Sequence, residues 1–466
     1  MPVVVIVADG ARPDTLALGI DGGSLPALAR LRKEGGSYTI TSAFPSVTGP
    51  AYAPFIMGRY PGPAGLPGLR WYDRSRTISR LPGNSRSYVG LEMLHVDSDI
   101  DASTPTIFEL VPNSIAALSV IGRGLANGDR IGHSVRFIAR AALTHFGGNV
   151  RGWLEIDRDI GREVAKNIRE RAPDFVFAAL TGIDKTSHSA GHDAPIVLDA
   201  LRTVDNTVAE IRDDAERAGR WEDMHVWIVS DHGHSPVTSH EDLAGLLRGL
   251  GSRVIAHPWV YSSSAEVAVM VSGNAMAHVY LDLATRERPW WPSRDPRWNE
   301  IAALLISRPS VDLMILPRSP SEAEVHGNGR GRARMVWHNG VTSYEPLTGD
   351  PLGIGEQREL DDNEAYEACI ASDYPDALVQ IANLSGASRS GEIILSAARN
   401  WDFRSRYEPI PHISSHGALH REHMLVPLLV NRPVTGLPRR TVDIMPSALK
   451  ALGVGIPSGL DGRSFD

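Results

Sequence analysis

The feature that most constrains the fold of this chain is a series of short apolar runs, each long enough for one buried strand. They are bounded by turn-forming residues and cover positions 3–7, 115–121, 175–180, 226–229 and 425–430. Continuous apolar strands of this length are typical of a parallel sheet covered on both faces. Between them, residues 195–216 carry apolar side chains at spacings of three and four, as on one face of a helix. We therefore expect an α/β fold with a central, mostly parallel sheet flanked by helices.

The length and the local pattern predict more than one structural region. At 466 residues the chain exceeds what a single hydrophobic core usually serves. Residues 251–410 contain segments that alternate apolar and polar side chains, which predicts an inserted α+β cap region. We expect the core in residues 1–250 and 411–466, with a minor insertion at about 74–172. The cap is expected to set substrate specificity, since variable segments on a fixed scaffold commonly do so.

Composition excludes several classes of function. A net charge of −8 offers no basic surface for nucleic acid or for an anionic membrane. The single cysteine, Cys369, excludes a disulfide within the chain and a metal site built from cysteines. No apolar run reaches the roughly 18 residues needed to span a bilayer, and the opening segment lacks the basic start of a signal peptide. We expect a cytoplasmic protein; the sequence gives no indication of its oligomeric state.

Ionisable residues follow the predicted strands at the positions where such sheets bind ligands. Asp9 ends the first run, and Asp231 and His232 follow the run that ends at Val229. Asp184 and His188, four residues apart after the run at 175–180, would share one face of a helical turn. Each could instead be a turn residue, a helix cap or a surface histidine. A carboxylate and an imidazole directly behind a buried strand favour a metal site, because burying them unpaired is costly.

One more histidine completes a set of candidate metal ligands whose oxygen and nitrogen donors suit hard or borderline metal ions. His416 lies in SSHGALH, just before the run at 425–430, between small neighbours that would let a cation approach. Three carboxylates and three imidazoles are enough for two divalent ions of the kind that suit zinc, manganese or iron. Two ions in one site can bind both oxygens of an in-line phosphoryl displacement. The sequence therefore predicts two metal ions, with zinc as the first choice and manganese or iron as alternatives.

A hydroxyl nucleophile is available in the segment PSVTGP, where Thr48 precedes a predicted helix start. The N-terminus of a helix offers N–H groups to a phosphate. Thr48 could also be an N-cap, which is the common role of threonine in that setting. Ser46 and Ser42 are competing nucleophile candidates.

The motifs occur in a specific order along the chain: a strand ending in Asp9-Gly10, then FPSVTGP, GRYPGPAG, GIDKTSHSAGH, VSDHGH, SSHG and the tail VDIMPSALKALGVGIPSGLDGRSF. This order resembles the alkaline phosphatase superfamily, and within it the type I phosphodiesterase and nucleotide pyrophosphatase branch. The motifs span nearly the whole chain, and the expected insertions fall between them. The resemblance implies an alkaline-phosphatase-like fold and hydrolysis of a small-molecule phosphate ester.

The resemblance also implies a division of the ligands between two sites. One metal would be held by Asp184, His188 and His416. The other would be held by Asp9, Asp231 and His232, with Thr48 as nucleophile and ligand at this second metal. A phospho-threonine intermediate would follow, and sulfate esters are disfavoured because threonine cannot become the formylglycine of sulfatases.

The chain departs from that branch at one position. The branch usually carries an Asn in an N-x-x-[YF]-D setting, where it contacts a phosphate oxygen, whereas here Gly-Leu-Arg-Trp precedes Tyr72 and Asp73. Arg70 or Lys185 could replace it as a cationic donor. Trp71 and Tyr72, with Phe55, could stack on a leaving group, or could be core aromatics. Five further histidines near these motifs are expected to be mostly structural or to orient ligands: His192, His234, His412, His420 and His423.

Three functional hypotheses remain open from the sequence. The first is a phosphodiesterase or nucleotide pyrophosphatase with two metals. The second keeps the same site but acts on a phosphomonoester or a phosphonate. The third is a non-catalytic metal-binding or interaction module, in which the arginine-rich stretch 327–334 contacts a partner or forms a solvated hairpin; the intact ligand set argues against it.

Overall fold

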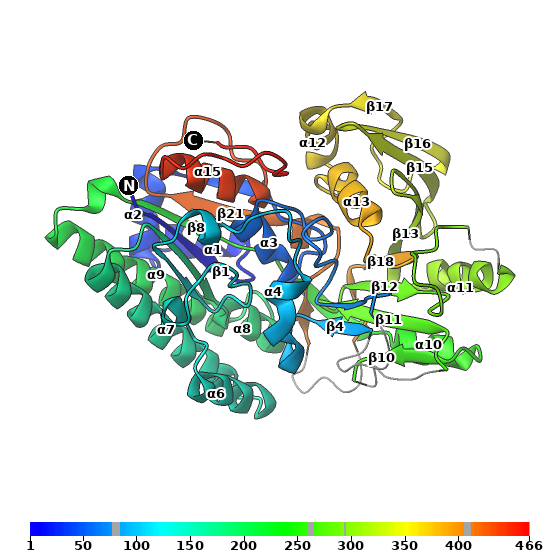
Figure 1. Ribbon diagram of the computed structural model, residues 1–466, viewed down its shortest axis with the longest axis horizontal. Helices are drawn as coiled ribbons and strands as arrows, with labels where there is room; N and C mark the ends of the chain where they lie inside the picture. The colour runs from blue at the N-terminus through cyan, green and yellow to red at the C-terminus, as the bar shows by residue number, and fades with distance from the viewer. Residues whose placement is uncertain (77–83, 259–263, 293–294, 405–411, 466) are drawn as a thin grey trace.

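A computed structural model describes residues 1–76, 84–258, 264–292, 295–404 and 412–465. Figure 1 shows two regions side by side, one a sheet flanked by helices and the other rich in β-structure. The first region confirms the expected mixed α/β fold with a central sheet.

The central sheet has seven strands, in the order β2 (Gly36–Thr41), β21 (Leu425–Val430), β8 (His225–Val229), β1 (Val3–Ala8), β7 (Phe175–Leu180), β5 (Ser114–Ala117) and β6 (Arg130–Ile131). Neighbouring strands from β8 to β6 are parallel, as predicted. The run at 425–430 was expected in a parallel arrangement, and this is wrong, because β21 is antiparallel to both β8 and β2. The chain enters β21 from the short helix α14 (Arg421–Met424), beside the end of β8, and therefore runs back along the sheet.

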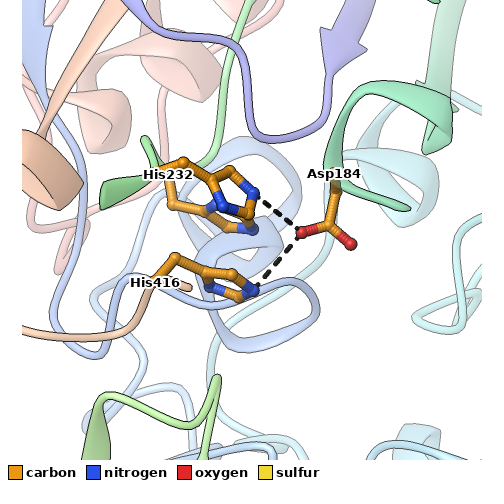
Figure 2. Close-up of side chains that lie close together, drawn as sticks. Asp184, His232 and His416 are labelled. Carbon is orange, nitrogen blue, oxygen red and sulfur yellow. Dashed lines mark hydrogen bonds and ion pairs between the residues drawn. The ribbon is translucent and has the colours of Figure 1, made fainter. Parts of the chain in front are cut away.

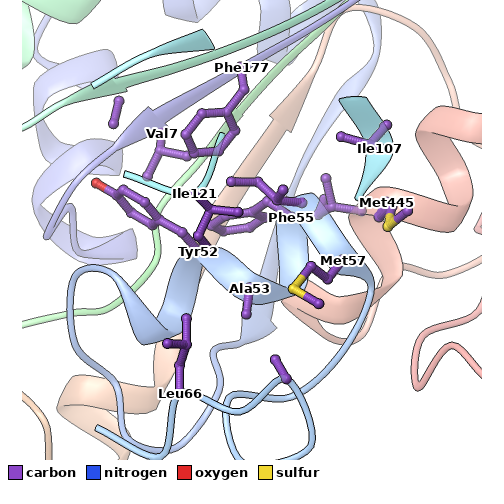
Figure 3. Packing of buried hydrophobic residues seen from close by; sticks show 14 of the residues in the cluster. Val7, Tyr52, Ala53, Phe55, Met57, Leu66, Ile107, Ile121, Phe177 and Met445 are labelled. Carbon is purple, nitrogen blue, oxygen red and sulfur yellow. The ribbon is translucent and has the colours of Figure 1, made fainter. Parts of the chain in front are cut away.

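Both faces of this sheet are covered, which explains the continuous apolar runs. Side chains alternate between faces along a strand, so Val5 and Val7 of β1 belong to one buried cluster and Val4 and Ile6 to another. The first cluster includes α3 (Ala53–Met57) and α15 (Ile444–Ala451), and Figure 3 shows part of it. The second includes α7 (Val150–Arg171) and α9 (Pro195–Arg217), the latter matching the helix predicted at 195–216.

Strand register brings the ends of three strands to one edge of the sheet. Ala8 of β1 pairs with Leu180 of β7, and Val7 pairs with Val229 of β8. The residues that follow these strands therefore leave the sheet at the same level. They lead to Asp9, to α8 (Gly182–Ala190) and to Asp231.

The stretch expected as a minor insertion at about 74–172 does not stand apart from the core. Its strands β5 and β6 hydrogen-bond into the central sheet, and α7 packs against that sheet. The apolar run beginning at Ile115 is a buried strand, and the burial it requires ties this stretch to the core.

A nine-stranded sheet lies within the range 251–410. Its order is β10 (Val254–Ala256), β11 (Val267–Ser272), β12 (Met276–Tyr280), β18 (Ile393–Ala397), β13 (Val311–Ser319), β14 (Glu322–Gly327), β15 (Gly331–His338), β16 (Val341–Gly349) and β17 (Gln357–Leu360). The arginine-rich stretch forms the hairpin between β14 and β15, where Arg330 pairs with Asp312 and Arg334 pairs with Glu322. The boundary expected at 410 falls in 405–411, outside the described residues.

A short three-stranded sheet connects the two regions. It consists of β19 (Asn400–Asp402), β9 (Ser235–His240) and β20 (Ser414–Ser415). β9 follows the VSDHGH motif and β20 directly precedes His416, so this sheet fixes both segments relative to each other.

The remaining elements are shorter or peripheral: α1 (Pro13–Asp21), α2 (Pro26–Glu34), η1 (Pro50–Tyr52), β3 (Arg70–Tyr72), β4 (Ser85–Ser87), η2 (Gly90–His95), α4 (Val96–Asp99), α5 (Ile107–Leu110), η3 (Asn127–Asp129), α6 (Val135–Phe146), η4 (Trp221–Asp223), α10 (Leu243–Gly249), α11 (Pro296–Ser307), α12 (Asp362–Ile370), α13 (Ala377–Gly386) and η5 (Thr441–Asp443). Within the described ranges, no helix has the length and apolar character needed to cross a bilayer.

Candidate metal centre

Buried carboxylates and imidazoles gather at the edge of the central sheet where β1, β7 and β8 end. Two groups of described residues present ligand atoms close enough together to hold a cation. They are Asp9 with Asp231 and His232, and Asp184 with His232, His234 and His416. Figure 2 shows the polar ends of Asp184, His232 and His416 turned toward one another. The structure thus brings together residues that lie more than 200 positions apart in the chain.

The first group surrounds the hydroxyl of Thr48. Thr48 Oγ1 donates to Asp9 Oδ1 over 3.1 Å and lies 3.1 Å from His232 Nε2. His232 Nε2 is in turn 3.2 Å from Asp9 Oδ1 and 3.5 Å from Asp231 Oδ2. One hydroxyl, two carboxylates and one imidazole therefore converge on a single point.

Thr48 is the only one of the three candidate hydroxyls placed in this way. Ser46 Oγ donates to the carbonyl of Ala418, and Ser42 Oγ donates to the carbonyl of Asp231. Both serines are fully buried and engaged with main chain. Thr48 does not act as a helix cap, because the following 3-10 helix η1 has Gly49 at its N-cap position and no side-chain cap.

The second group is centred on one oxygen of Asp184. His188 Nε2, four residues along α8, lies 3.1 Å from Asp184 Oδ1, as the spacing predicted, although His188 is not among the four residues of this group. His234 Nε2 lies 3.1 Å and His416 Nε2 lies 3.4 Å from the same oxygen. His232 connects the two groups, since its ring stacks on that of His416 with centroids 3.6 Å apart.

The other ring nitrogen of each histidine is held by main chain. Nδ1 of His188 donates to the carbonyl of Ser414 over 2.8 Å, and Nδ1 of His416 donates to that of Ser46 over 2.9 Å. Nδ1 of His232 donates to the carbonyl of Gly233 over 3.1 Å. A carbonyl accepts only, so in the neutral rings these bonds leave Nε2 with a free lone pair, as in metal-binding histidines.

The electrostatics of the centre fit a cation better than an empty cluster. Burial, and then the neighbouring carboxylate of Asp9, raise the pKa of Asp231 well above its usual range. Its Oδ2 is buried without a hydrogen-bond partner. For His232, burial lowers the pKa, but Asp231 and Asp9 outweigh burial and raise it to about 9. Unpaired buried carboxylates are costly, and a divalent cation would compensate them.

Lys185 lies at the rim of the centre. Its Nζ is 2.8 Å from Asp184 Oδ2, and about a quarter of the side chain is exposed (26%). Burial lowers its pKa, but the carboxylates of Asp184 and Asp9 outweigh burial and raise it. The lysine is therefore a permanent positive charge next to the candidate ligands.

The aromatic residues expected to contact substrate are placed differently. Trp71 is fully buried and Tyr72 is 4% exposed, and both pack in the apolar cluster of the first region. Their rings therefore have no free face for a ligand, which contradicts the stacking role considered for them. Phe55 is likewise a core residue. Arg70, on the same strand β3, is half-buried.

Two residues contact the candidate metal ligands although their sequence context did not predict this. Tyr52, not considered from the sequence, donates its hydroxyl to Asp9 Oδ2 over 2.9 Å. Its position four residues after Thr48 was the available signal, since a helical turn places such residues on one side. His234 was expected to be mainly structural, yet it points at Asp184 as directly as His188 does.

His412 and His423 are not members of either group. His412 stacks on His188 with ring centroids 4.3 Å apart. His423 accepts from the N–H of Ala418 and contacts Ser235 Oγ, which is a structural role.

Carboxylates, imidazoles and a hydroxyl gathered at the carboxyl edge of an α/β sheet form a site of the kind that metal-dependent hydrolases use. Residues 3–289 match the family described as type I phosphodiesterase / nucleotide pyrophosphatase, which is more than half of the chain. The chain belongs to this family, and it is a phosphoric ester hydrolase. The expectation from the motif order is thus confirmed, and the interaction-module hypothesis loses its support. No curated protein sequence matches the chain significantly.

Solved structures show the same fold at low identity. Phosphonoacetate hydrolase from Sinorhizobium meliloti 1021, in complex with phosphonoformate, is 18% identical with a TM-score of 0.58, and the match covers 97% of this chain and 96% of that one. Murine ectonucleotide pyrophosphatase / phosphodiesterase 5, as an inactive variant in complex with AMP, is 14% identical with a TM-score of 0.56, covering 98% and 96%. The human form of the latter is 13% identical with a TM-score of 0.56, covering 99% and 97%.

Proposed function

We propose that this protein hydrolyses a small-molecule phosphodiester or nucleotide pyrophosphate bond, with Thr48 as a covalent nucleophile and two divalent metal ions. The observation that carries the proposal is the position of Thr48 Oγ1, 3.1 Å from both Asp9 Oδ1 and His232 Nε2. A hydroxyl held among metal-binding groups is the arrangement that nucleophilic catalysis on phosphorus requires.

The donor set fits the metals that the family implies. Asp9, Asp231 and His232, with Thr48, would hold one ion, and Asp184, His188 and His416 would hold the other. Imidazole and carboxylate ligands suit zinc first, with manganese or iron as alternatives. Bound there, two ions would lower the pKa of the threonine hydroxyl and neutralise charge on the phosphoryl oxygens.

The residues of the chain then have separate tasks. Asp9 accepts the hydrogen bond of the Thr48 hydroxyl and so fixes the position of its oxygen. The Thr48 hydroxyl loses its proton to solvent and Oγ1 forms a bond to phosphorus, while the bond from phosphorus to the leaving oxygen breaks and that oxygen takes a proton from water. Water then breaks the Thr48–phosphorus bond and releases a phosphomonoester. Lys185, a rim cation, would contact a phosphoryl oxygen in place of the branch's missing Asn. Arg70 is a second candidate for that contact.

A paired assay tests the reaction class. Zinc- or manganese-loaded protein is offered bis-p-nitrophenyl phosphate, p-nitrophenyl phosphate and phosphonoacetate. Faster cleavage of the diester supports the proposal. Faster cleavage of the monoester or of phosphonoacetate would move the assignment to the second hypothesis, a phosphatase or a phosphonate hydrolase on the same site.

Two variants of Thr48 test the nucleophile. Thr48→Ala should remove most turnover while metal content and fold are retained, and Thr48→Ser, which keeps a hydroxyl, should retain measurable activity. Mass spectrometry of protein quenched during turnover of bis-p-nitrophenyl phosphate should find a p-nitrophenyl phosphoryl group on Thr48, because only one of the two ester bonds has broken. Full activity of the Thr48→Ala variant would refute the assignment.

A further inference from the structure

We propose that His234 is an additional ligand of the metal at Asp184, so that this ion is held by four protein side chains: Asp184, His188, His234 and His416. The inference rests on the proposed metal centre and adds a ligand that the motif comparison does not assign. It is carried by the geometry around a single carboxylate oxygen.

Three imidazole nitrogens lie at similar distances from Asp184 Oδ1. His188 and His234 are at 3.1 Å and His416 is at 3.4 Å. In a tetrahedral site with metal–ligand bonds of about 2.0 Å, two ligand atoms are separated by about 3.3 Å. Each nitrogen therefore lies at about the separation expected between two ligands of one ion, and the ligand atoms of Asp184, His234 and His416 all lie within 4.8 Å of one another.

The rings themselves are arranged symmetrically about this point. The centroids of His188 and His234 are 5.0 Å apart, those of His188 and His416 are 5.0 Å apart, and those of His234 and His416 are 5.1 Å apart. Three rings that coordinate one ion through Nε2 lie at the corners of such a triangle.

Ser414 favours one tautomer of His234. When its Oγ donates to the carbonyl of Ser235 over 3.0 Å, it accepts from His234 Nδ1, which is 3.3 Å away. In that tautomer Nδ1 carries the proton, and Nε2 presents a lone pair to the carboxylate oxygen of Asp184. Two lone pairs 3.1 Å apart repel each other unless a cation lies between them.

The chain makes room for this ring at a specific position. Gly10, with φ of +81°, lies so close that a Cβ on it would be 2.9 Å from His234 Nε2 and 3.1 Å from the Cα of Asp184. His234 is completely buried. The glycine after the first strand thus permits the approach of His234 to Asp184.

A fourth protein ligand has a consequence for the ion. Catalytic zinc sites keep a coordination position open, whereas structural sites with four protein ligands do not. To contact the phosphoryl group as proposed, the ion at Asp184 would take it as a fifth ligand. We therefore expect tighter binding at this site than at the site of Thr48.

Substitution of His234 by residues of opposite character separates ligation from a structural role. In His234→Leu the ligand is removed, and in His234→Glu a carboxylate replaces it. If His234 binds the ion, zinc affinity at this site should fall at least tenfold in the leucine variant and be better preserved in the glutamate variant. If His234 only donates to Asp184, the glutamate should be the worse of the two, because it would face another carboxylate.

The measurements are zinc affinity by chelator competition, metal content per chain, and the visible spectrum of the cobalt-loaded protein. The cobalt spectrum reports the number of ligands and should change in His234→Leu. His192→Leu is the matched control and should leave all three unchanged. Thermal melting without metal checks that each variant folds.

The outcomes distinguish this inference from the proposed function. The inference alone would be overturned if the wild type binds two ions and turns over substrate while folded His234→Leu keeps the same zinc affinity and cobalt spectrum. A wild-type protein that binds no zinc or cobalt would overturn both.

Discussion

The phenol of Tyr52 donates to one oxygen of Asp9 over 2.9 Å, while Thr48 Oγ1 donates to the other over 3.1 Å. Asp9 is thus oriented by two residues on a single turn of chain, and the carboxylate cannot rotate without losing one of them. Burial, and then the carboxylates of Asp9 and Asp231, raise the pKa of Tyr52 well above its usual range, so it remains a donor. This pair links the core packing of the ring to the geometry of the metal centre.

The first prediction follows for Tyr52→Phe. The ring contact with Phe177, with centroids 5.5 Å apart, would be kept, and only the hydrogen bond to Asp9 is lost. Groups that orient metal ligands typically contribute 10- to 100-fold in metal affinity or activity. We expect a zinc affinity roughly tenfold weaker, with activity partly restored by excess zinc. Tyr280→Phe, which loses a hydrogen bond to Arg389 elsewhere, is the control and should leave zinc affinity unchanged.

The second prediction concerns Asp231, whose replacement should stabilise the metal-free protein and reduce the stabilisation that zinc provides. Without metal, Asp231 is a buried carboxylate near Asp9, and Asp231→Asn should raise the melting temperature in the presence of a chelator. With metal, the same variant should gain less from zinc than the wild type does, because it binds zinc more weakly. Ligand binding at 100 times Kd adds about 2.7 kcal/mol to folding. Melting curves with chelator and with zinc test this, and a variant less stable than wild type in chelator would contradict it.

Several features of the site could be predicted from short stretches of sequence. The positions of Asp9, Asp184 and Asp231 could be predicted because each follows a buried strand, and parallel strands end at the same edge. The i, i+4 pair with His188 followed from helix geometry alone. These features depend on a few neighbouring residues and on general properties of α/β sheets.

Other features depended on contacts between distant segments. The antiparallel direction of β21 is set by where the chain returns from β20, which no local pattern encodes. Trp71 could as well have been a binding residue as a core residue, and only packing against β11 and its surroundings decided it. The approach of His234 to Asp184 required the register of β8 and the absence of a side chain at Gly10.

The third prediction concerns Lys185→Met, which removes the charge and keeps the length of the side chain. If Lys185 contacts a phosphoryl oxygen, KM for an anionic diester should rise about tenfold, equivalent to ~1.4 kcal/mol, when both metals are saturated. Lys185→Arg should recover part of this loss. An unchanged kcat/KM in the methionine variant would leave the contact to Arg70.

The last prediction uses a buried histidine far from the centre. His278 Nε2 donates to the carbonyl of Pro67 over 2.9 Å, and its Nδ1 accepts from the N–H of Gly391 over 3.1 Å. Both nitrogens are engaged in the neutral form, and burial lowers the pKa of His278 from 6.5 to about 4. Well above pH 6.5 the ring is neutral in both the folded and the unfolded chain, so the contribution of His278 to stability is fully present.

As the pH falls below 6.5, His278 takes up a proton in the unfolded chain but not in the folded one, and stability is lost until the pH passes about 4. The total loss from this residue is ~3 kcal/mol, at up to ~1.4 kcal/mol per pH unit. In His278→Gln this part is absent, so its stability should depend less steeply on pH between 6.5 and 4, even if the variant is less stable at pH 7. Melting temperatures of both proteins in chelator across this range provide the measurement, since other titrating groups contribute equally to both. Parallel curves would show that the buried ring is protonated in the folded chain as readily as in the unfolded one.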